Sequence, residues 1–155
     1  MTKTTSDQVR SRSDAKLLGG FVLLLSALLL VAGFAATALA QSGKARFELA
    51  FTTDNRETRE EKNEFRPDTG KIYVIYMAAD IPAGGRLKAV WVLEKAEGYQ
   101  ENAKIDESST SPGAGSFMGA FSYSKPPKGW PVGTYKIELY VGDRLDKTVR
   151  FKVVK

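Results

Sequence analysis

The sequence of 155 residues contains no cysteine and no histidine. Without cysteine the chain can form no disulfide bond and has no thiol to carry a lipoprotein acyl group. It also lacks thiolate and imidazole, the side chains that most often ligate zinc or act as nucleophile and base. The composition is otherwise that of a folded protein, with 43% hydrophobic and 26% charged residues. A domain above ~100 residues buries enough surface to fold without disulfides, so we expect one domain plus an appendage.

The chain also lacks a strong excess of charge beyond its N-terminal region. The formal net charge is +5, but residues 41–155 hold 19 basic and 16 acidic side chains, a net charge of +3. This small excess is spread along the chain, whereas a nucleic-acid interface gathers its basic residues on one face. We therefore expect a solvated surface of mixed charge and no nucleic-acid partner.

A long apolar segment lies near the start of the chain. Residues 17–40 read LLGGFVLLLSALLLVAGFAATALA and contain no charged side chain. As a helix they would extend about 36 Å, enough to cross the ~30 Å hydrocarbon core of a bilayer. The basic side chains that precede Leu17 favour a cytoplasmic N-terminus and export of the residues that follow. We therefore predict one N-terminal hydrophobic helix that inserts into the membrane.

Two outcomes of this insertion stay open. Ala38-Leu39-Ala40 followed by Gln41 fits the small-x-small pattern of signal peptidase, which predicts cleavage after Ala40. The long basic region before Leu17 and the length of the apolar segment instead favour a retained signal anchor. In both cases we expect residues 41–155 to work in the periplasm or at the cell surface. The chain would then touch the membrane only through residues 17–40, and only if they are retained.

Residues 41–155 predict an all-β domain of about seven short strands, with no convincing amphipathic helix. Residues 71–78, KIYVIYMA, are apolar on both faces and predict a central strand. Residues 54–64 predict a charged, solvated loop, and residues 108–116 predict a flexible loop. The strands that we expect cover residues 45–52, 71–78, 86–95, 103–107, 117–124, 135–141 and 145–153. The first has a predicted buried face of Ala45, Phe47, Leu49 and Phe51.

The last two strands predict a β-hairpin whose register is constrained by burial. If Gly142-Asp143 formed a plain two-residue loop, Ile137 would face Thr148 and the apolar sets would lie on opposite faces. Pairing Val141 with Leu145 would instead place Ile137 against Val149 and Tyr135 against Phe151. We therefore predict either a three-residue connection or a tight turn followed by a bulge.

This pattern resembles a disulfide-free immunoglobulin-like domain of the bacterial extracytoplasmic kind. The residues that carry the resemblance are Trp91 and the segment GWPVGTYKIELYVGDRLDKTVRFKV, residues 129–153. Gly133-Thr134-Tyr135 resembles the tyrosine corner of such folds, in which the hydroxyl bonds back to nearby backbone. The resemblance implies an antiparallel immunoglobulin-like β-sandwich and carries little information about function. The core residues that we expect are Trp91, Tyr135, Ile137, Leu139, Val149 and Phe151.

Three residues before the hairpin are candidates for an interaction. Trp130 could be an exposed aromatic that grips a partner, but a cap on the sandwich beside Tyr135 is the favoured interpretation. Pro126 and Pro127 could form a proline-rich recognition element, although a stiff loop is the ordinary interpretation. The paired carboxylates lie in charged loops or turns and the methionines are scattered, so we predict no catalytic residue, no metal site and no cofactor.

The leading functional hypothesis is a non-catalytic exported module that contacts an unidentified envelope protein, such as an accessory subunit of an envelope complex. A second hypothesis is a protease-inhibitor-like domain that presents the loops 108–116 and 124–131 at one end of the sandwich. A third is a small-ligand carrier whose pocket opens between the sheets and is lined by Trp91 and tyrosines. Assembly by strand exchange through residues 44–53 is a further, weaker alternative.

Overall fold

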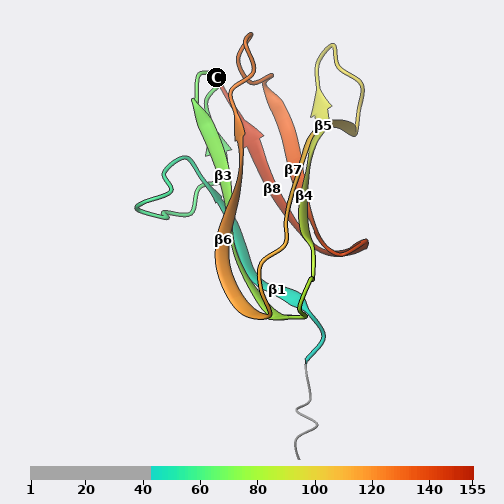
Figure 1. Cartoon of the computed structure of the whole chain (residues 1–155). Helices are drawn as coiled ribbons and strands as arrows, with labels where there is room; N and C mark the ends of the chain where they lie inside the picture. The colour runs from blue at the N-terminus through green and yellow to red at the C-terminus, as the bar shows by residue number, and fades with distance from the viewer. Residues whose placement is uncertain (1–42) are drawn as a thin grey trace, which may run out of the picture. The chain divides into compact units, whose positions relative to one another are not determined.

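The computed structural model describes residues 43–155, so the predicted helix over residues 17–40 and the cleavage-site residues Ala38, Ala40 and Gln41 lie outside the described part. The described residues form an all-β sandwich of two sheets (Figure 1). Its strands are β1 (Arg46–Thr53), β2 (Glu64–Phe65), β3 (Lys71–Ile81), β4 (Leu87–Ala96), β5 (Ala103–Thr110), β6 (Gly115–Ser124), β7 (Gly133–Val141) and β8 (Arg144–Val153). Within these residues no helix is long and apolar enough to cross a membrane.

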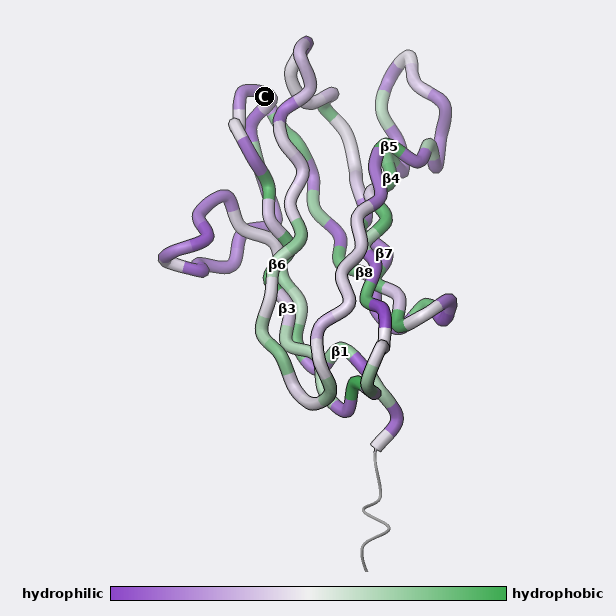
Figure 2. Tube along the Cα trace, viewed as in Figure 1, coloured by the Kyte–Doolittle hydropathy of each residue, from purple (hydrophilic) through white to green (hydrophobic). Residues whose placement is uncertain are grey.

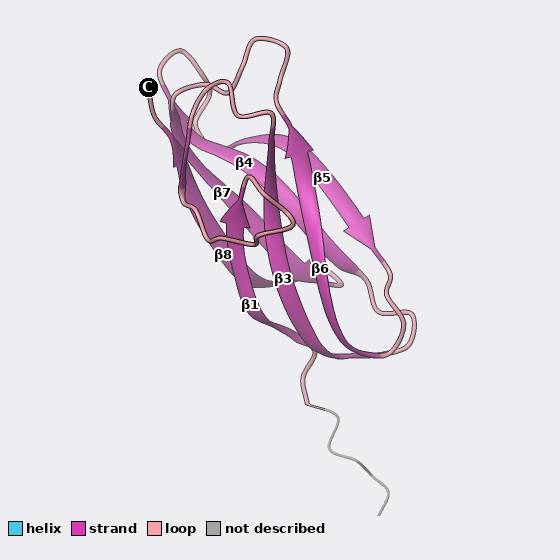
Figure 3. Ribbon diagram, turned by 90° about the vertical axis from the view of Figure 1, so that its left-hand side faces the viewer, coloured by secondary structure: helices cyan, strands magenta, loops and turns pink. Residues whose placement is uncertain are grey.

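One sheet has three strands in the order β1-β3-β6, and the other has five in the order β2-β8-β7-β4-β5. Figure 3 looks onto the three-stranded sheet, with β3 between its two edge strands as its apolar sequence predicts. The sequence predicts about seven antiparallel strands, whereas the structure has eight, and the pairing of β2 with β8 is parallel. The additional strand, Glu64–Phe65, is too short to show a periodic pattern in the sequence.

The core lies between the two sheets, where the apolar faces of the strands meet (Figure 2). Trp91 on β4 is fully buried against Tyr123 and Phe151, and its indole nitrogen has no hydrogen-bond partner among residues 43–155. Of the six core residues that the sequence predicts, five are buried and Val149 is partly buried against the same cluster. Tyr135 stacks on Phe151 with ring centroids 4.9 Å apart, which joins neighbouring strands of the five-stranded sheet.

The first strand differs from its predicted pattern at Leu49. A shift of register between Phe47 and Leu49 places one additional residue in β1 opposite β3. Because side chains alternate with a period of two, this bulge moves every later residue to the other face. Phe47 is therefore buried as predicted, whereas Leu49 is 45% exposed and Thr52 takes a buried position.

The hairpin of β7 and β8 has the tight turn followed by a bulge. Gly142 has a φ of 60° in the two-residue turn, and the register shifts between Leu139 and Tyr140. As predicted, Ile137 lies opposite Val149 and Tyr135 lies opposite Phe151. The predicted pair of Val141 with Leu145 is wrong, because Val141 faces Arg144 and Leu145 is 47% exposed. The bulge comes only after a second pair, Tyr140 with Leu145, so the apolar alternation of β8 begins beyond Leu145.

The predicted flexible loop 108–116 is much shorter in the structure. β5 continues to Thr110 and β6 begins at Gly115, which leaves four residues between them. A run of serine and threonine does not by itself distinguish a strand from a loop. Here Ser108, Ser109 and Thr110 belong to β5 and pair with Ala89, Lys88 and Leu87 of β4. The predicted edge strand over residues 103–107 is present as the start of β5, which forms one edge of the five-stranded sheet.

Candidate functional site

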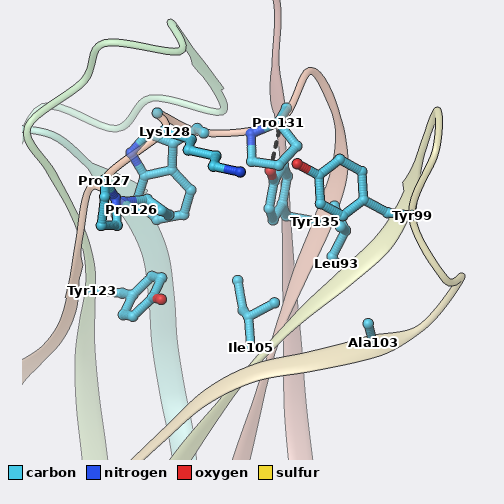
Figure 4. A pocket seen from close by; sticks show the side chains of 12 residues that line it. Leu93, Tyr99, Ala103, Ile105, Tyr123, Pro126, Pro127, Lys128, Pro131 and Tyr135 are labelled. Atoms are coloured by element: carbon cyan, nitrogen blue, oxygen red, sulfur yellow. Dashed lines mark hydrogen bonds between the residues drawn. The ribbon is translucent and has the colours of Figure 1, made fainter.

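The strongest candidate site is an apolar cavity of about 380 Å³ that opens between the two sheets. Leu93, Ala103, Ile105 and Tyr135 come from the five-stranded sheet, and Tyr123 comes from the end of β6. The remaining wall is formed by the β4–β5 turn and by the loop between β6 and β7. In Figure 4 the side chains of Tyr99, Ile105 and Tyr123 surround a common space. The residues lining the cavity are Leu93, Tyr99, Ala103, Ile105, Tyr123, Pro126, Pro127, Lys128, Gly129, Trp130, Pro131 and Tyr135.

Trp130 is the fixed wall of this cavity. It is only 2% exposed, and its indole N–H donates a 2.8 Å hydrogen bond to the carbonyl of Thr69. Its ring packs edge-on against Tyr123 and Tyr135, with centroid separations of 5.4 and 5.8 Å. The preceding Gly129 has a φ of 83°, which lets the chain turn against the carbonyl of Pro67. Trp130 therefore caps the sandwich beside Tyr135 and also presents ring surface to the cavity.

Tyr135 forms the tyrosine corner that the resemblance implies. Its hydroxyl donates a 2.7 Å hydrogen bond to the carbonyl of Pro131, four residues earlier. Burial, with a smaller contribution from the nearby Tyr99, raises the pKa of Tyr135. The phenol is therefore a neutral donor that holds the loop, and it is not available as an acid or base near neutral pH.

Two residues at the cavity are free to meet an incoming group. Tyr99 lies in the turn between β4 and β5 and is 53% exposed, although it is large and aromatic. Lys128 is exposed and is the only charged side chain among the twelve that line the cavity. The site thus combines aromatic and aliphatic walls with one cation, which suits binding of apolar groups and supplies no acid–base pair.

The candidate residues from the sequence divide between the cavity and the core. Pro126, Pro127 and Trp130 all line the cavity. Trp91 lies deeper in the core and does not line it. Tyr99 belongs to a set of tyrosines for which the sequence favours packing over binding, and the isoleucine of an edge strand, Ile105, carries no local signal for a pocket. Only their position opposite the proline-rich loop makes them walls of a site.

Several carboxylates of the described residues are engaged in structural contacts. Asp146 accepts a 2.6 Å hydrogen bond from the backbone N–H of Phe47 and also binds Arg144. On β5 the Lys104 ammonium donates a 2.6 Å hydrogen bond to Glu107 and lowers the pKa of that carboxyl. No group of three or more carboxylates suited to a metal ion occurs within residues 43–155.

Comparison with known proteins gives a similarity of structure only. No protein-family model matches the chain, and no curated protein matches its sequence. A solved structure of an immunoglobulin-like protein from Pseudomonas aeruginosa is similar, with a TM-score of 0.49 and 16% sequence identity. The similarity covers 74% of this chain and 99% of that one. At this identity it carries no information about function.

Proposed function

We propose that this chain is a non-catalytic, exported immunoglobulin-like module that binds a partner protein of the cell envelope through the cavity beside Trp130. The observation that carries the proposal is the cavity itself, an aromatic and proline-lined hollow with a partly free tyrosine at its opening. Protein interfaces gather their binding energy in such places, where an apolar anchor of the partner enters a pocket and is removed from water. Export is expected from the apolar segment over residues 17–40.

Three features support a binding role over a catalytic one. The walls are almost wholly apolar, the single charged lining residue is Lys128, and the Tyr135 hydroxyl is held by the Pro131 carbonyl. A nucleophile with its base, or an acid with its conjugate partner, would need two titratable groups within hydrogen-bond reach. The cavity offers shape and apolar surface instead.

The protease-inhibitor hypothesis requires two loops that lie together at one end of the sandwich. The loop 111–114 precedes β6 and the loop 125–132 follows it, so the ten residues of β6 separate the two loops. A strand of that length spans about 33 Å. The two loops thus lie at opposite ends of the sandwich, and they form no common surface for a protease.

A photocrosslinking amino acid at position 99 of the full-length chain, in intact envelopes, tests the proposal. We expect one discrete adduct with an envelope protein from position 99. The matched control is the same amino acid at Tyr140, a partly exposed tyrosine of β7 whose hydroxyl bonds Glu138 and which does not line the cavity. The same adducts from both positions, or none from position 99, would contradict the proposal.

A variant that fills the cavity sharpens this experiment. Ala103→Trp adds a large ring to the cavity wall, whereas Ser109→Trp adds the same ring to an exposed position of the same strand outside the cavity. We expect Ala103→Trp to abolish the adduct at position 99 and Ser109→Trp to preserve it. Retention of the adduct in both variants would show that the partner does not enter the cavity.

A small-ligand carrier is the second candidate, favoured by the apolar cavity of about 380 Å³ between the sheets. Lys128 would then pair with an anionic group of an apolar ligand. Trp130 is one of two tryptophans in the chain and the only one at the cavity, so its emission reports on occupancy. In a Trp91→Phe background, titration with apolar carboxylates should shift that emission, and Lys128→Gln should weaken the response. Absence of any shift would remove this candidate.

A further inference from the structure

The four edges of the two sheets are protected to very different degrees. An edge strand exposes unpaired backbone groups, and proteins protect such edges with charges, bulges, short strands or covering segments. β5 has Lys104, Asp106 and Glu107 within its eight residues. β2, the opposite edge of the same sheet, is only two residues long. Both edges of the five-stranded sheet are therefore protected against pairing with another strand.

β1, one edge of the three-stranded sheet, is protected as well. It contains Arg46 and Glu48, and its ladder is interrupted by the bulge after Phe47. Side chains of β8 also bond its backbone, because Asp146 accepts the N–H of Phe47 and Arg144 donates to the carbonyl of Ala45. Another strand could not approach this part of β1 without displacing those bonds.

β6 itself has none of these protections. It is ten residues long, and the sequence from Ser108 to Ser124 contains no charged residue. Its pairing with β3 is regular from Phe117 to Ser124, without a bulge or a proline. Within residues 43–155 no other strand pairs with it and no loop backbone bonds it. In Figure 3, β6 is the edge strand of the three-stranded sheet on the side opposite to β1.

We propose that β6 pairs antiparallel with β6 of a second copy of this chain, which joins the two three-stranded sheets across a two-fold axis. Such an axis places β6 of one copy antiparallel to β6 of the other. A charged residue near the middle of the strand would therefore lie close to the same charge of the other copy. β6 has no charge to oppose, and Gly119, Ala120 and Ser122 near its middle are small. On its outer face Met118 is 54% exposed, and its sulfur accepts a hydrogen bond from Arg59 of the loop between β1 and β2, so Arg59 must turn aside where the two copies meet. A different partner would be selected by charge or shape along the edge, and β6 itself carries no charge for that selection.

This inference is independent of the proposed function. The proposed partner enters the cavity beside Trp130, whereas the second copy would bind along the free side of β6. β6 contributes only Tyr123 to the cavity. The β6–β6 pairing would therefore leave the cavity open in both copies, and either proposal can fail without the other.

Single cysteines in the full-length chain test the pairing directly, because the natural sequence has none. We would place one cysteine at a time at Ser116, Met118, Ala120 and Ser122, which share the outer face of β6. The matched control is Ser109→Cys, an exposed serine on the protected edge β5. Near a two-fold axis a residue lies opposite its own copy within reach of a disulfide, and residues further away do not.

We expect a disulfide-linked dimer of two copies that is strongest at one of the four positions and absent for Ser109→Cys. Equal dimer at Ser109 and along β6 would indicate random collision and overturn the proposal. A mixed disulfide with another protein, or no dimer from any β6 position, would overturn it as well. The position of the maximum would give the register of the pair.

Charge variants give a second test that does not depend on the register. Ser116→Lys with Ser122→Lys should abolish the dimer, and Ser116→Glu with Ser122→Glu should do the same, because like charges would meet across the axis. Co-expression of the two charged forms, each with the same cysteine, should restore a mixed dimer. Unchanged melting of each variant, followed by circular dichroism, would show that the fold is intact. Persistence of the dimer in either like-charged form would contradict the β6–β6 pairing.

Discussion

The two ends of the sandwich are closed by different kinds of contact. At one end, the start of β1 is tied to β8 by polar contacts, in which Asp146 accepts the N–H of Phe47 and Arg144 donates to the carbonyl of Ala45. At the other end, Trp130 and the loop between β6 and β7 cap the sheets with apolar rings and leave a cavity. Hydrogen bonds are directional and close a gap between strands, whereas rings of fixed shape leave space wherever they do not interlock. Binding capacity is therefore expected at the cavity end.

Replacing Trp130 by alanine should produce the largest loss. The change removes a buried ring that contacts Tyr123, Tyr135 and Phe151, and we expect a decrease of about 3–5 kcal/mol in the free energy of unfolding. Urea denaturation would measure it. Trp130→Phe is the control, since it keeps a ring but leaves the Thr69 carbonyl without its donor. A loss below about 1 kcal/mol for Trp130→Ala would mean that the ring does not hold the cavity end together.

Replacing Asp146 by alanine should produce a smaller loss at the polar end. The Phe47 N–H and the Arg144 guanidinium would both lose an acceptor, which we expect to cost about 2–3 kcal/mol. Asp146→Asn keeps an oxygen that can accept the Phe47 N–H, so it should recover part of the loss in the same denaturation experiment. Equal losses for the two variants would show that the backbone contact is unimportant and that the charge alone matters.

Replacing Tyr135 by phenylalanine should produce the smallest loss near neutral pH, about 1 kcal/mol for the hydrogen bond to Pro131. Its effect on the pH dependence is more informative. Burial raises the pKa of Tyr135 in the fold, so the folded chain keeps this proton after an unfolded tyrosine has lost it at about pH 10. This contribution is complete below about pH 10 and is lost as the pH rises further.

Tyr135→Phe should therefore flatten the decline of stability above about pH 10, measured as melting temperature against pH. Part of the decline should remain, because burial also raises the pKa of Tyr76. An identical alkaline decline in the wild type and in Tyr135→Phe would show that the Tyr135 phenol does not resist ionisation in the fold.

Much of the fold follows from local periodicity in the sequence. The alternation in residues 135–153 predicts the hairpin and places Ile137 opposite Val149. A slip by one residue would turn one of the two apolar faces toward solvent, so burial of both faces excludes it. The same reasoning fails at Leu49, where a bulge in β1 reverses the parity. It fails again at Leu145, because the bulge of this hairpin lies beyond the second residue pair. A bulge depends on the neighbouring strand, so a pattern within one strand cannot place it.

The cavity was much less accessible to prediction than the strands. Pro126, Pro127 and Trp130 stand out in the sequence as a shaped loop, but Tyr99 and Ile105 reach the same site from a turn and an edge strand. Residues so far apart in the chain share a wall only after both sheets have assembled. The sequence allows the hypothesis of a pocket between the sheets, but it does not show that this pocket lies beside Trp130 and not beside Trp91.

Residue types and their order are enough to show which segments extend as strands, which faces of most strands are apolar, and which chemistry the missing cysteine and histidine exclude. These properties depend on side-chain identity and on a period of two residues, both of which are local. The positions of the bulges, the unprotected edge and the cavity depend instead on how the two sheets assemble. Those features arise from distances between strands that are remote in the chain, and such distances are set only when the two sheets pack together.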